Sequence, residues 1–310
     1  MTRDWLQGEA FMGEDFVPLA QAQVNIATHA LNYGTGCFEG IRAYWNAEHE
    51  QLYVLKMREH YQRLQASARI LKLQLAYTVD ELGEITLELL RRNGYRQDVY
   101  IRPLLFKSAP EISLKLTGVA DTFAVFCMPL GDYLDTSAGL KCCTSSWVRL
   151  NDNALPARAK ATGAYINACL ASDDARQSGF DEAIVLTADG HVSEGASANL
   201  FLVREGTLIT SPVSDSILEG ITRQAVLELA AEELQVPIEV RSIDRTELYV
   251  ADELFFCGTG VQIAPITSVD HRLIGDGKPG KITRELQRLY FAAVRGNNPK
   301  YASWVVPVYQ

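Results

Sequence analysis

The chain has 310 residues, enough for two domains with separate hydrophobic cores. Its composition is 47% hydrophobic and 22% charged, as in ordinary globular proteins, and its net charge of −9 argues against a broad nucleic-acid-binding surface. No apolar run approaches the roughly 20 residues that cross a bilayer. The N-terminus lacks the apolar segment of a signal peptide. We therefore expect a cytoplasmic protein without nucleic-acid or membrane partners.

The six cysteines are scattered without CxxC spacing, and several lie in apolar, strand-like runs. Buried free thiols are therefore expected rather than disulfides, which suits a reducing cytosol. The five histidines are dispersed and form no ligand pattern, so no metal is expected.

The N-terminal part combines strands and helices without a regular βαβ rhythm. Residues 1–55 predict short strands and turns. Apolar residues at helical spacing predict two amphipathic helices, His60–Leu75 and Val79–Arg92, and Asn93 with Gly94 stops the second. Period-two alternation and β-branched or aromatic residues predict strands at Gln51–Leu55, Val99–Phe106 and Thr122–Leu130.

A polar stretch with glycine at both ends, Gly131–Gly139, predicts an interdomain linker. We therefore expect a small domain of residues 1–130 and a larger domain of residues 140–310. The same patterns predict strands in the larger domain at Lys141–Val148, Asp181–Thr187, Val192–Val203, Leu208–Ser211 and Glu253–Cys257. Its helices are expected at Thr162–Gln177, Ile221–Leu234 and Lys281–Arg295.

A single lysine, Lys160, stands among small residues in the segment 157–165, which Tyr165 closes. A lysine that forms a Schiff base must lose its proton, and an apolar pocket favours the neutral amine. Small neighbours let a flat cofactor lie close to the backbone. For an isolated lysine the default interpretation is the cap of an Ala-rich helix on a wet surface, so the assignment of Lys160 depends on further site residues downstream.

Glu194 lies among small residues between apolar runs, where a buried carboxylate needs a cationic or N–H partner. A protonated pyridine nitrogen would satisfy it and make a pyridoxal ring a better electron sink. The alternative is an edge-strand glutamate that faces water. A helix is expected to begin at Gly220, Ile221 and Thr222, and the free amides of a helix N-terminus bind phosphate. The alternative is that Thr222 simply caps the helix.

Further motifs offer ligand contacts. The turn Gly258–Gly260 supplies amides and the Thr259 hydroxyl, but lacks the third glycine of a dinucleotide signature. Arg58 could grip a phosphate or lie on the surface. The strand period of two places Tyr100 and Arg102 on one face, where a hydroxyl and a guanidinium can grip a carboxylate.

Two other segments carry further motifs. In residues 38–42, an aromatic side chain, a glycine and an arginine occupy alternate positions, so they would lie on one face of a strand. Residues 195–199 are similar to the start of a nucleophile elbow, but they lack its closing glycine and a suitably placed histidine, so a serine hydrolase is not expected.

Together, the motifs resemble those of branched-chain aminotransferases, which are fold-type IV pyridoxal-phosphate enzymes. The resemblance covers nearly the whole chain and rests on residues 33–42, 100–103, 158–160, 193–195, 220–223 and 258–259. It implies a mixed α/β fold with a smaller N-terminal α/β domain and a larger, pseudo-barrel-like C-terminal α/β domain. The cofactor, pyridoxal 5'-phosphate, would lie in the cleft between them.

The resemblance also implies a role for each site residue. Lys160 would be catalytic, binding the cofactor covalently and moving the substrate proton. Glu194 would meet the pyridine nitrogen, Tyr165 the phenolic oxygen, and Leu218 would pack under the ring. The phosphate would be held by Arg58, Ile221, Thr222 and Thr259. The substrate would be met by Tyr33, Phe38, Gly40, Arg42, Tyr100, Arg102, Tyr133, Thr259 and Gly260, and Tyr165 would also line its pocket.

The implied reaction is a ping-pong transamination of L-leucine, L-isoleucine or L-valine with 2-oxoglutarate, giving branched-chain 2-oxo acids and L-glutamate. Tyr33 would reach the neighbouring subunit, so a homodimer is the minimum unit. Leu130 and Ala164 depart from the family's usual tryptophan and asparagine, and both concern the shape of the pocket. The alternatives are a D-amino-acid or (R)-amine transaminase, an aminodeoxychorismate lyase, or a silent oligomeric binding protein of this fold.

Overall fold

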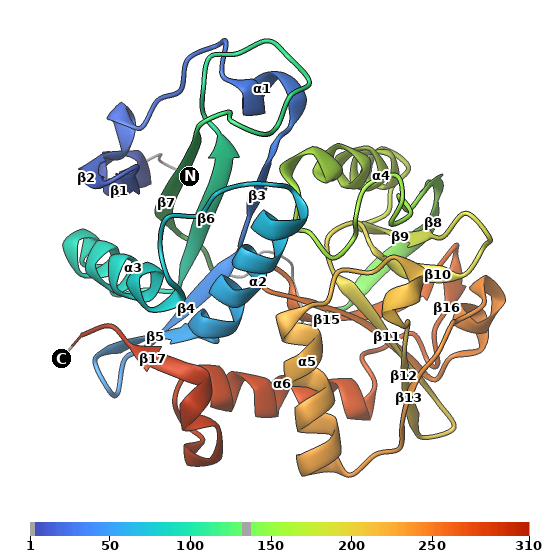
Figure 1. The fold of residues 1–310 in the computed structure, drawn as a ribbon. Coiled ribbons are helices and arrows are strands. Elements are labelled where there is room, and N and C mark those ends of the chain that lie inside the picture. Colours follow the sequence, from blue (N-terminus) through green and yellow to red (C-terminus); the bar gives the residue numbers. More distant parts are fainter. Residues whose placement is uncertain (1–3, 132–137, 310) are drawn as a thin grey trace. The chain divides into compact units, whose positions relative to one another are not determined.

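The structure is a computed structural model that describes residues 4–131 and 138–309 (Figure 1). The described residues form two compact units. Unit 1 contains residues 4–131, 159–163 and 292–309, and unit 2 contains residues 138–158 and 164–291.

The expected domains of residues 1–130 and 140–310 stay a prediction, and most of the expected linker Gly131–Gly139 lies outside the described residues. The compact units differ from those domains because residues 159–163 and 292–309 belong to unit 1. Long-range hydrogen bonds explain the difference. The Phe38 N–H donates to the carbonyl of Lys160, and a C-terminal strand pairs with the strand Gln51–Leu55.

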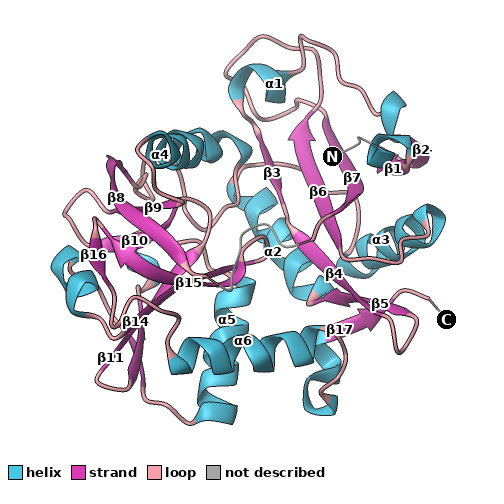
Figure 2. Ribbon diagram, turned by 180° about the vertical axis from the view of Figure 1, so that it is seen from behind, coloured by secondary structure: helices cyan, strands magenta, loops and turns pink. Residues whose placement is uncertain are grey.

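Unit 1 is built on an antiparallel sheet, which has eight strands among the described residues (Figure 2). The order is β17-β5-β4-β6-β7-β1-β2, and β3 pairs with β6. The strands are β1 Glu9–Met12, β2 Asp15–Pro18, β3 Gly36–Phe38, β4 Ile41–Asn46, β5 Gln51–Leu55, β6 Val99–Lys107, β7 Asp121–Pro129 and β17 Val305–Pro307. The three strands expected here, now β5, β6 and β7, are confirmed to within two residues.

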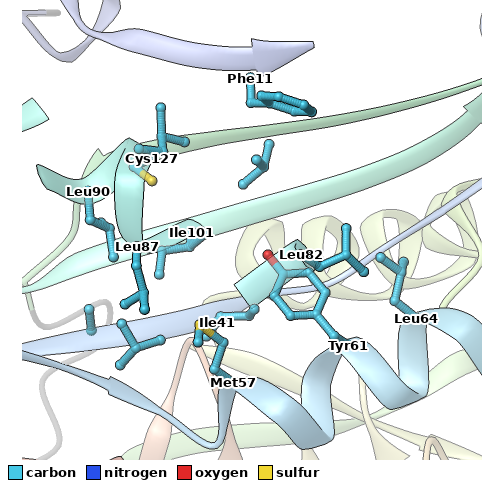
Figure 3. Packing of buried hydrophobic residues seen from close by; sticks show 14 of the residues in the cluster. Phe11, Ile41, Met57, Tyr61, Leu64, Leu82, Leu87, Leu90, Ile101 and Cys127 are labelled. Carbon is cyan, nitrogen blue, oxygen red and sulfur yellow. The ribbon is translucent and has the colours of Figure 1, made fainter. Parts of the chain in front are cut away.

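The helices α2 (Met57–Ile70) and α3 (Val79–Asn93) pack their apolar sides against this sheet (Figure 3). Tyr61 and Leu64 of α2 belong to the same buried cluster as Ile101 of β6. The expected helix His60–Leu75 begins and ends earlier, because Lys72 adopts a left-handed φ of 56° that ends the helical path.

The expected bounds of α3 are nearly correct, and local signals set both ends. Thr78 and Glu81 form a capping box at its start, and Gly94 takes the left-handed conformation at its end. A short helix, α1 (His29–Tyr33), precedes β3.

Unit 2 is built on a mixed sheet, which has nine strands among the described residues. The order is β10-β9-β8-β15-β14-β11-β12-β13, and β16 pairs with β15. The strands are β8 Leu140–Val148, β9 Glu182–Leu186, β10 Val192–Gly195, β11 Asn199–Arg204, β12 Thr207–Thr210, β13 Ile238–Val240, β14 Glu253–Gly258, β15 Gln262–Val269 and β16 Arg272–Leu273. The remaining helices are α4 Tyr165–Gln177, α5 Ile221–Leu229 and α6 Lys281–Val294.

The expected single strand Val192–Val203 is wrong, because it is two strands, β10 and β11. The Gly195 N–H donates to the carbonyl of Ala198 at 2.7 Å and closes a turn between them. The expected helix from Ile221 also differs, since α5 ends at Leu229 and continues as a π-helical turn. The two sheets with their helices confirm the predicted mixed α/β class.

None of the described helices has both the length and the apolar character needed to cross a membrane. All six cysteines are free thiols. Four are buried, and burial raises the pKa of Cys37 to about 12, which makes that thiol a poor nucleophile.

Candidate active site

Lys160 belongs to unit 1, where hydrogen bonds on both sides hold its backbone. Its N–H donates to Oγ of Ser67 on α2 at 3.1 Å, and its carbonyl accepts from the Phe38 N–H at 3.1 Å. The amine Nζ lies 5.0 Å from the centroid of the Phe38 ring. The lysine expected to react therefore has a fixed backbone, and its amine lies against an aromatic face.

Tyr100 and Arg102 lie on one face of β6, as the strand period predicts. Arg102 donates from Nη2 to the Tyr100 hydroxyl at 2.9 Å, and its guanidinium carbon lies 4.3 Å from the Phe38 ring centroid. Within the described part of the chain, the buried Nε of Arg102 has no hydrogen-bond partner. Unit 1 thus brings an amine and a guanidinium with an unused donor to the same aromatic ring.

Gly40 leaves room for Tyr100. A β-carbon at position 40 would lie 2.2 Å from the Tyr100 hydroxyl oxygen and 2.9 Å from Cζ, which is closer than real contacts allow. This close approach explains why the turn between β3 and β4 carries a glycine.

Gly40→Ala is expected to displace Tyr100 from Arg102 and raise KM for the amino acid about 10-fold, since overpacking costs about 1–3 kcal/mol. Steady-state kinetics measures this effect. The double variant with Tyr100→Phe should lose less than the sum of the two single losses, because both changes disturb the contact between Tyr100 and Arg102. Fully additive losses would show that Gly40 acts by another route.

The other substrate residues expected from unit 1 lie in different surroundings. Arg42 is fully buried and donates from Nη2 to the carbonyls of Leu130 at 2.6 Å and Gly131 at 2.5 Å. It therefore anchors the chain after β7, and its contact with substrate stays a prediction. Tyr33 is exposed at the end of α1, and Tyr133 lies outside the described residues.

The two arginines near the start of α2 have different environments. The side chain of Arg58 is 64% exposed and pairs with Asp80 at 2.6 Å, so the predicted phosphate contact would require it to leave that partner. The side chain of Arg63 is 12% exposed, and its Nε and Nη2 each lie 2.8 Å from an oxygen of Glu39. Arg63 therefore binds the residue that follows Phe38.

The buried charges around Glu39 were not predicted from the sequence. His60 Nδ1 lies 2.7 Å from Glu39 Oε2, and both side chains are fully buried. Burial opposes ionisation of Glu39, but Arg63 and His60 outweigh it and hold the pKa of the Glu39 carboxyl far below its usual range. Burial also lowers the pKa of His60, which favours the neutral imidazole.

The spacing of residues on α2 is the signal that could have revealed this cluster. His60, Arg63 and Ser67 follow one another at intervals of three and four, so they share one helix face. Hydrogen bonds from this face reach Glu39 and the backbone of Lys160.

Glu194 lies in unit 2 on β10, and it is buried as the sequence suggested. Arg149 reaches its Oε1 with Nη2 at 2.5 Å, while Asn199 Nδ2 and the Leu218 N–H lie 2.8 Å and 3.2 Å from Oε2. The cationic partner Arg149 was missed, because nothing local in the sequence connects it to Glu194. These contacts fix the direction in which the carboxylate points.

The start of α5 presents backbone amides, as expected for a phosphate site. Gly220 is its N-cap in an extended conformation, and no described side chain caps the helix. Thr222 is buried in the first turn, beside Ile221. Amides without a side-chain cap and the helix dipole suit a phosphate group.

The remaining cofactor and substrate residues expected from the C-terminal half also belong to unit 2. Thr259 and Gly260 form the half-buried turn between β14 and β15, and Tyr165 is the half-buried first residue of α4. Leu218 lies in the loop before α5 and uses both its N–H and its carbonyl in the Glu194 network. In the described residues, no cluster of histidine, cysteine or acidic side chains is arranged to hold a metal.

Comparisons with known proteins show the family of the chain. The family described as amino-transferase class IV matches residues 36–269. The probable branched-chain-amino-acid aminotransferase of Aquifex aeolicus (strain VF5) is 46% identical over 309 residues, covering 100% of this chain and 99% of the relative.

Two solved structures match over almost their full length. The branched-chain aminotransferase of Thermoproteus uzoniensis with norvaline has 43% identity and a TM-score of 0.94, covering 97% of this chain and 99% of its own. The branched-chain amino acid aminotransferase of Thermobaculum terrenum, in its PLP-form, has 37% identity and a TM-score of 0.94, covering 98% of this chain and 99% of its own. A family match that includes both Lys160 and Glu194, with relatives similar from end to end, shows that the chain belongs to the class IV aminotransferases, in the branched-chain-amino-acid aminotransferase family.

Proposed function

We propose that this protein is a branched-chain-amino-acid transaminase, which uses pyridoxal 5'-phosphate to move the amino group of L-leucine, L-isoleucine or L-valine to 2-oxoglutarate. One observation carries this proposal: the Lys160 amine and the Arg102 guanidinium lie against the same Phe38 ring. A reactive amine beside a carboxylate-binding group suits chemistry at the α-carbon of an amino acid.

The described residues fit the cofactor. Its pyridine nitrogen needs an acid, which the buried Glu194 supplies, and its phosphate needs donors, which the α5 amides supply. When bound, pyridoxal phosphate supplies the electron sink that allows the Cα–H bond of an amino acid to ionise. The Thermobaculum terrenum relative in its PLP-form and the Thermoproteus uzoniensis relative with norvaline support the same pairing of cofactor and amino acid here.

Lys160 has two tasks in this proposal. Its Nζ would hold the cofactor covalently, and the same amine would accept the α-proton of the substrate as a general base. The two backbone hydrogen bonds of Lys160 keep the residue in place while its amine moves. On α2 we keep Arg58 as the candidate for the phosphate, because Nε and Nη2 of Arg63 are both bound to Glu39.

One substrate pocket must accept both an apolar branch and the γ-carboxylate of glutamate. Arg102 and Tyr100 provide its polar end, and the unused Nε donor of Arg102 supports binding of a carboxylate there. The Phe38 ring provides an apolar wall.

A homodimer is supported by an exposed apolar patch in unit 1. The patch consists of Leu31 on α1 and of Ile112 and Leu114 in the loop between β6 and β7, which are 62%, 68% and 87% exposed. His29 joins the two segments, since its N–H donates to the carbonyl of Ala109 at 3.0 Å and its Nε2 lies 2.8 Å from the carbonyl of Ser113. Large apolar side chains gathered on one surface favour a second copy as partner.

Analytical ultracentrifugation tests this interface. Leu114→Asp is expected to shift the dimer toward monomer, whereas Leu273→Asp, which changes a leucine of unit 2 that is 68% exposed, should not. A monomeric wild-type protein would contradict the dimer. We place this dimer in the cytoplasm, because all six cysteines are free thiols, as a reducing compartment keeps them.

Initial rates with 2-oxoglutarate test the reaction itself. We expect high rates with L-leucine, and low rates with D-alanine and an (R)-aryl amine, which are substrates of other enzymes with this fold type. Absence of activity on L-leucine would refute the proposal. A colourless protein that takes up no pyridoxal phosphate would instead support a silent binding protein.

A further inference from the structure

A buried side-chain amide connects the two ends of the cofactor site within unit 2. Asn199 is the first residue of β11 and is only 5% exposed. Its Nδ2 donates to Glu194 Oε2 at 2.8 Å and to the carbonyl of Leu218 at 2.9 Å. One amide group therefore holds both the acid expected at the pyridine nitrogen and the loop that leads into α5.

The chemistry of these contacts requires asparagine. A carboxylate oxygen and a backbone carbonyl only accept hydrogen bonds, so the group between them must donate twice, which a side-chain NH₂ does. An aspartate would have no donor when ionised and would place a second negative charge beside Glu194. The turn that separates β10 from β11 places Asn199 opposite Glu194.

The loop before α5 is held at further points of the same network. The Leu218 N–H donates back to Glu194 Oε2 at 3.2 Å, and Arg149 donates from Nε to the carbonyl of Ser216 at 3.0 Å. Gly220, the N-cap of α5, packs against the other side of the amide, since a β-carbon there would lie 1.9 Å from Asn199 Oδ1. Glu194 and the first amides of α5 are thus parts of one rigid assembly.

We propose that Asn199 is a positioning residue. It holds Glu194, which would bind the pyridine nitrogen, at a fixed position relative to the α5 amides, which would bind the phosphate. This inference rests on the proposed function. The pyridine nitrogen and the phosphate belong to one molecule, so their two anchors must lie within the span that this molecule can bridge. Asn199 keeps the anchors at such a separation through its contacts with Glu194 and Leu218. It acts through these groups without touching the cofactor.

Asn199→Ala tests this coupling. The change removes one donor from each of two buried acceptors, so pyridoxal phosphate should bind to the apoprotein at least about 10-fold more weakly. In the reloaded protein, both the ¹⁵N resonance of the pyridine nitrogen and the ³¹P resonance of the phosphate should shift from their wild-type positions.

Asn46→Ala provides a matched control. Asn46 is a buried asparagine of unit 1 that also donates twice from Nδ2, at 2.8 Å to the carbonyl of Arg295 and at 2.8 Å to Asn297 Oδ1. Its loss should move neither resonance. Glu194→Gln should move the ¹⁵N resonance alone, because the α5 loop keeps Asn199.

The outcomes separate the possibilities. If Asn199→Ala moves only the ¹⁵N resonance, Asn199 merely supports Glu194 and the coupling is refuted. Unchanged resonances, together with wild-type affinity for pyridoxal phosphate, refute it as well. Failure of the wild-type protein to bind pyridoxal phosphate would refute the proposed function instead. If Asn199→Ala does not fold, Asn199→Gln gives the same test, since its longer side chain displaces the amide without removing it.

Discussion

Lys160→Ala is expected to lower the rate of transamination at least about 10³-fold, because one side chain supplies both the covalent attachment and the general base. The absorbance band of a lysine-linked cofactor should disappear as well. Backbone hydrogen bonds to Ser67 and Phe38 hold residue 160 and do not use its side chain, so the variant should keep its fold. Steady-state rates with L-leucine and an absorbance spectrum measure both effects.

The control is Lys141→Ala, which removes an exposed lysine of β8 and should leave rate and spectrum unchanged. Added methylamine should restore part of the activity of Lys160→Ala, since a free amine can replace the lost base at a cost in effective concentration. A Lys160→Ala protein with the normal absorbance band and full turnover would refute the assignment of Lys160.

Glu39→Gln is expected to lower the free energy of unfolding by about 3 kcal/mol or more, because it leaves the guanidinium of Arg63 in the interior without its countercharge. Glu39 is fully buried and accepts hydrogen bonds from both Arg63 and His60. Urea denaturation at pH 7 measures the effect. Asp80→Asn on the exposed surface, which breaks only the ion pair with Arg58, should be nearly neutral.

The stability contributed by Glu39 should also depend on pH. Its pKa in the folded protein lies below the unfolded value of about 4.3, so the contribution is complete above that value and is lost as the pH falls toward the folded pKa. The difference between wild type and Glu39→Gln should therefore shrink from pH 7 to pH 3. A difference that stays constant over this range would show that the Glu39 charge does not stabilise the fold.

His60 should also lower the free energy of unfolding as the pH falls. Its pKa is lowered by burial, so the unfolded chain binds a proton more readily than the folded one once the pH falls below about 6.5. The wild-type protein should therefore lose stability first through His60 and then through Glu39 as the pH is lowered.

The sequence by itself determined those features that depend on neighbouring residues. The bounds of α3 follow from Thr78 and Gly94, and the shared face of Tyr100 and Arg102 follows from the period of a strand. The motif residues of the site were also recognisable, because the chemistry of a lysine, an acid and a bare helix N-terminus belongs to each segment on its own. The family comparison then showed that the chain belongs to the family that these motifs resemble.

Only the tertiary structure decided which residues hold these groups in place. Lys160 is held by Ser67, which is 93 residues away in the chain, and Glu194 by Arg149 and Asn199. Local periodicity could not show that Arg63 faces Glu39 while Arg58 faces solvent, nor that residues 192–203 form two strands. Such partners are chosen by burial, because a charge removed from water needs whichever complementary group the folded chain brings to it.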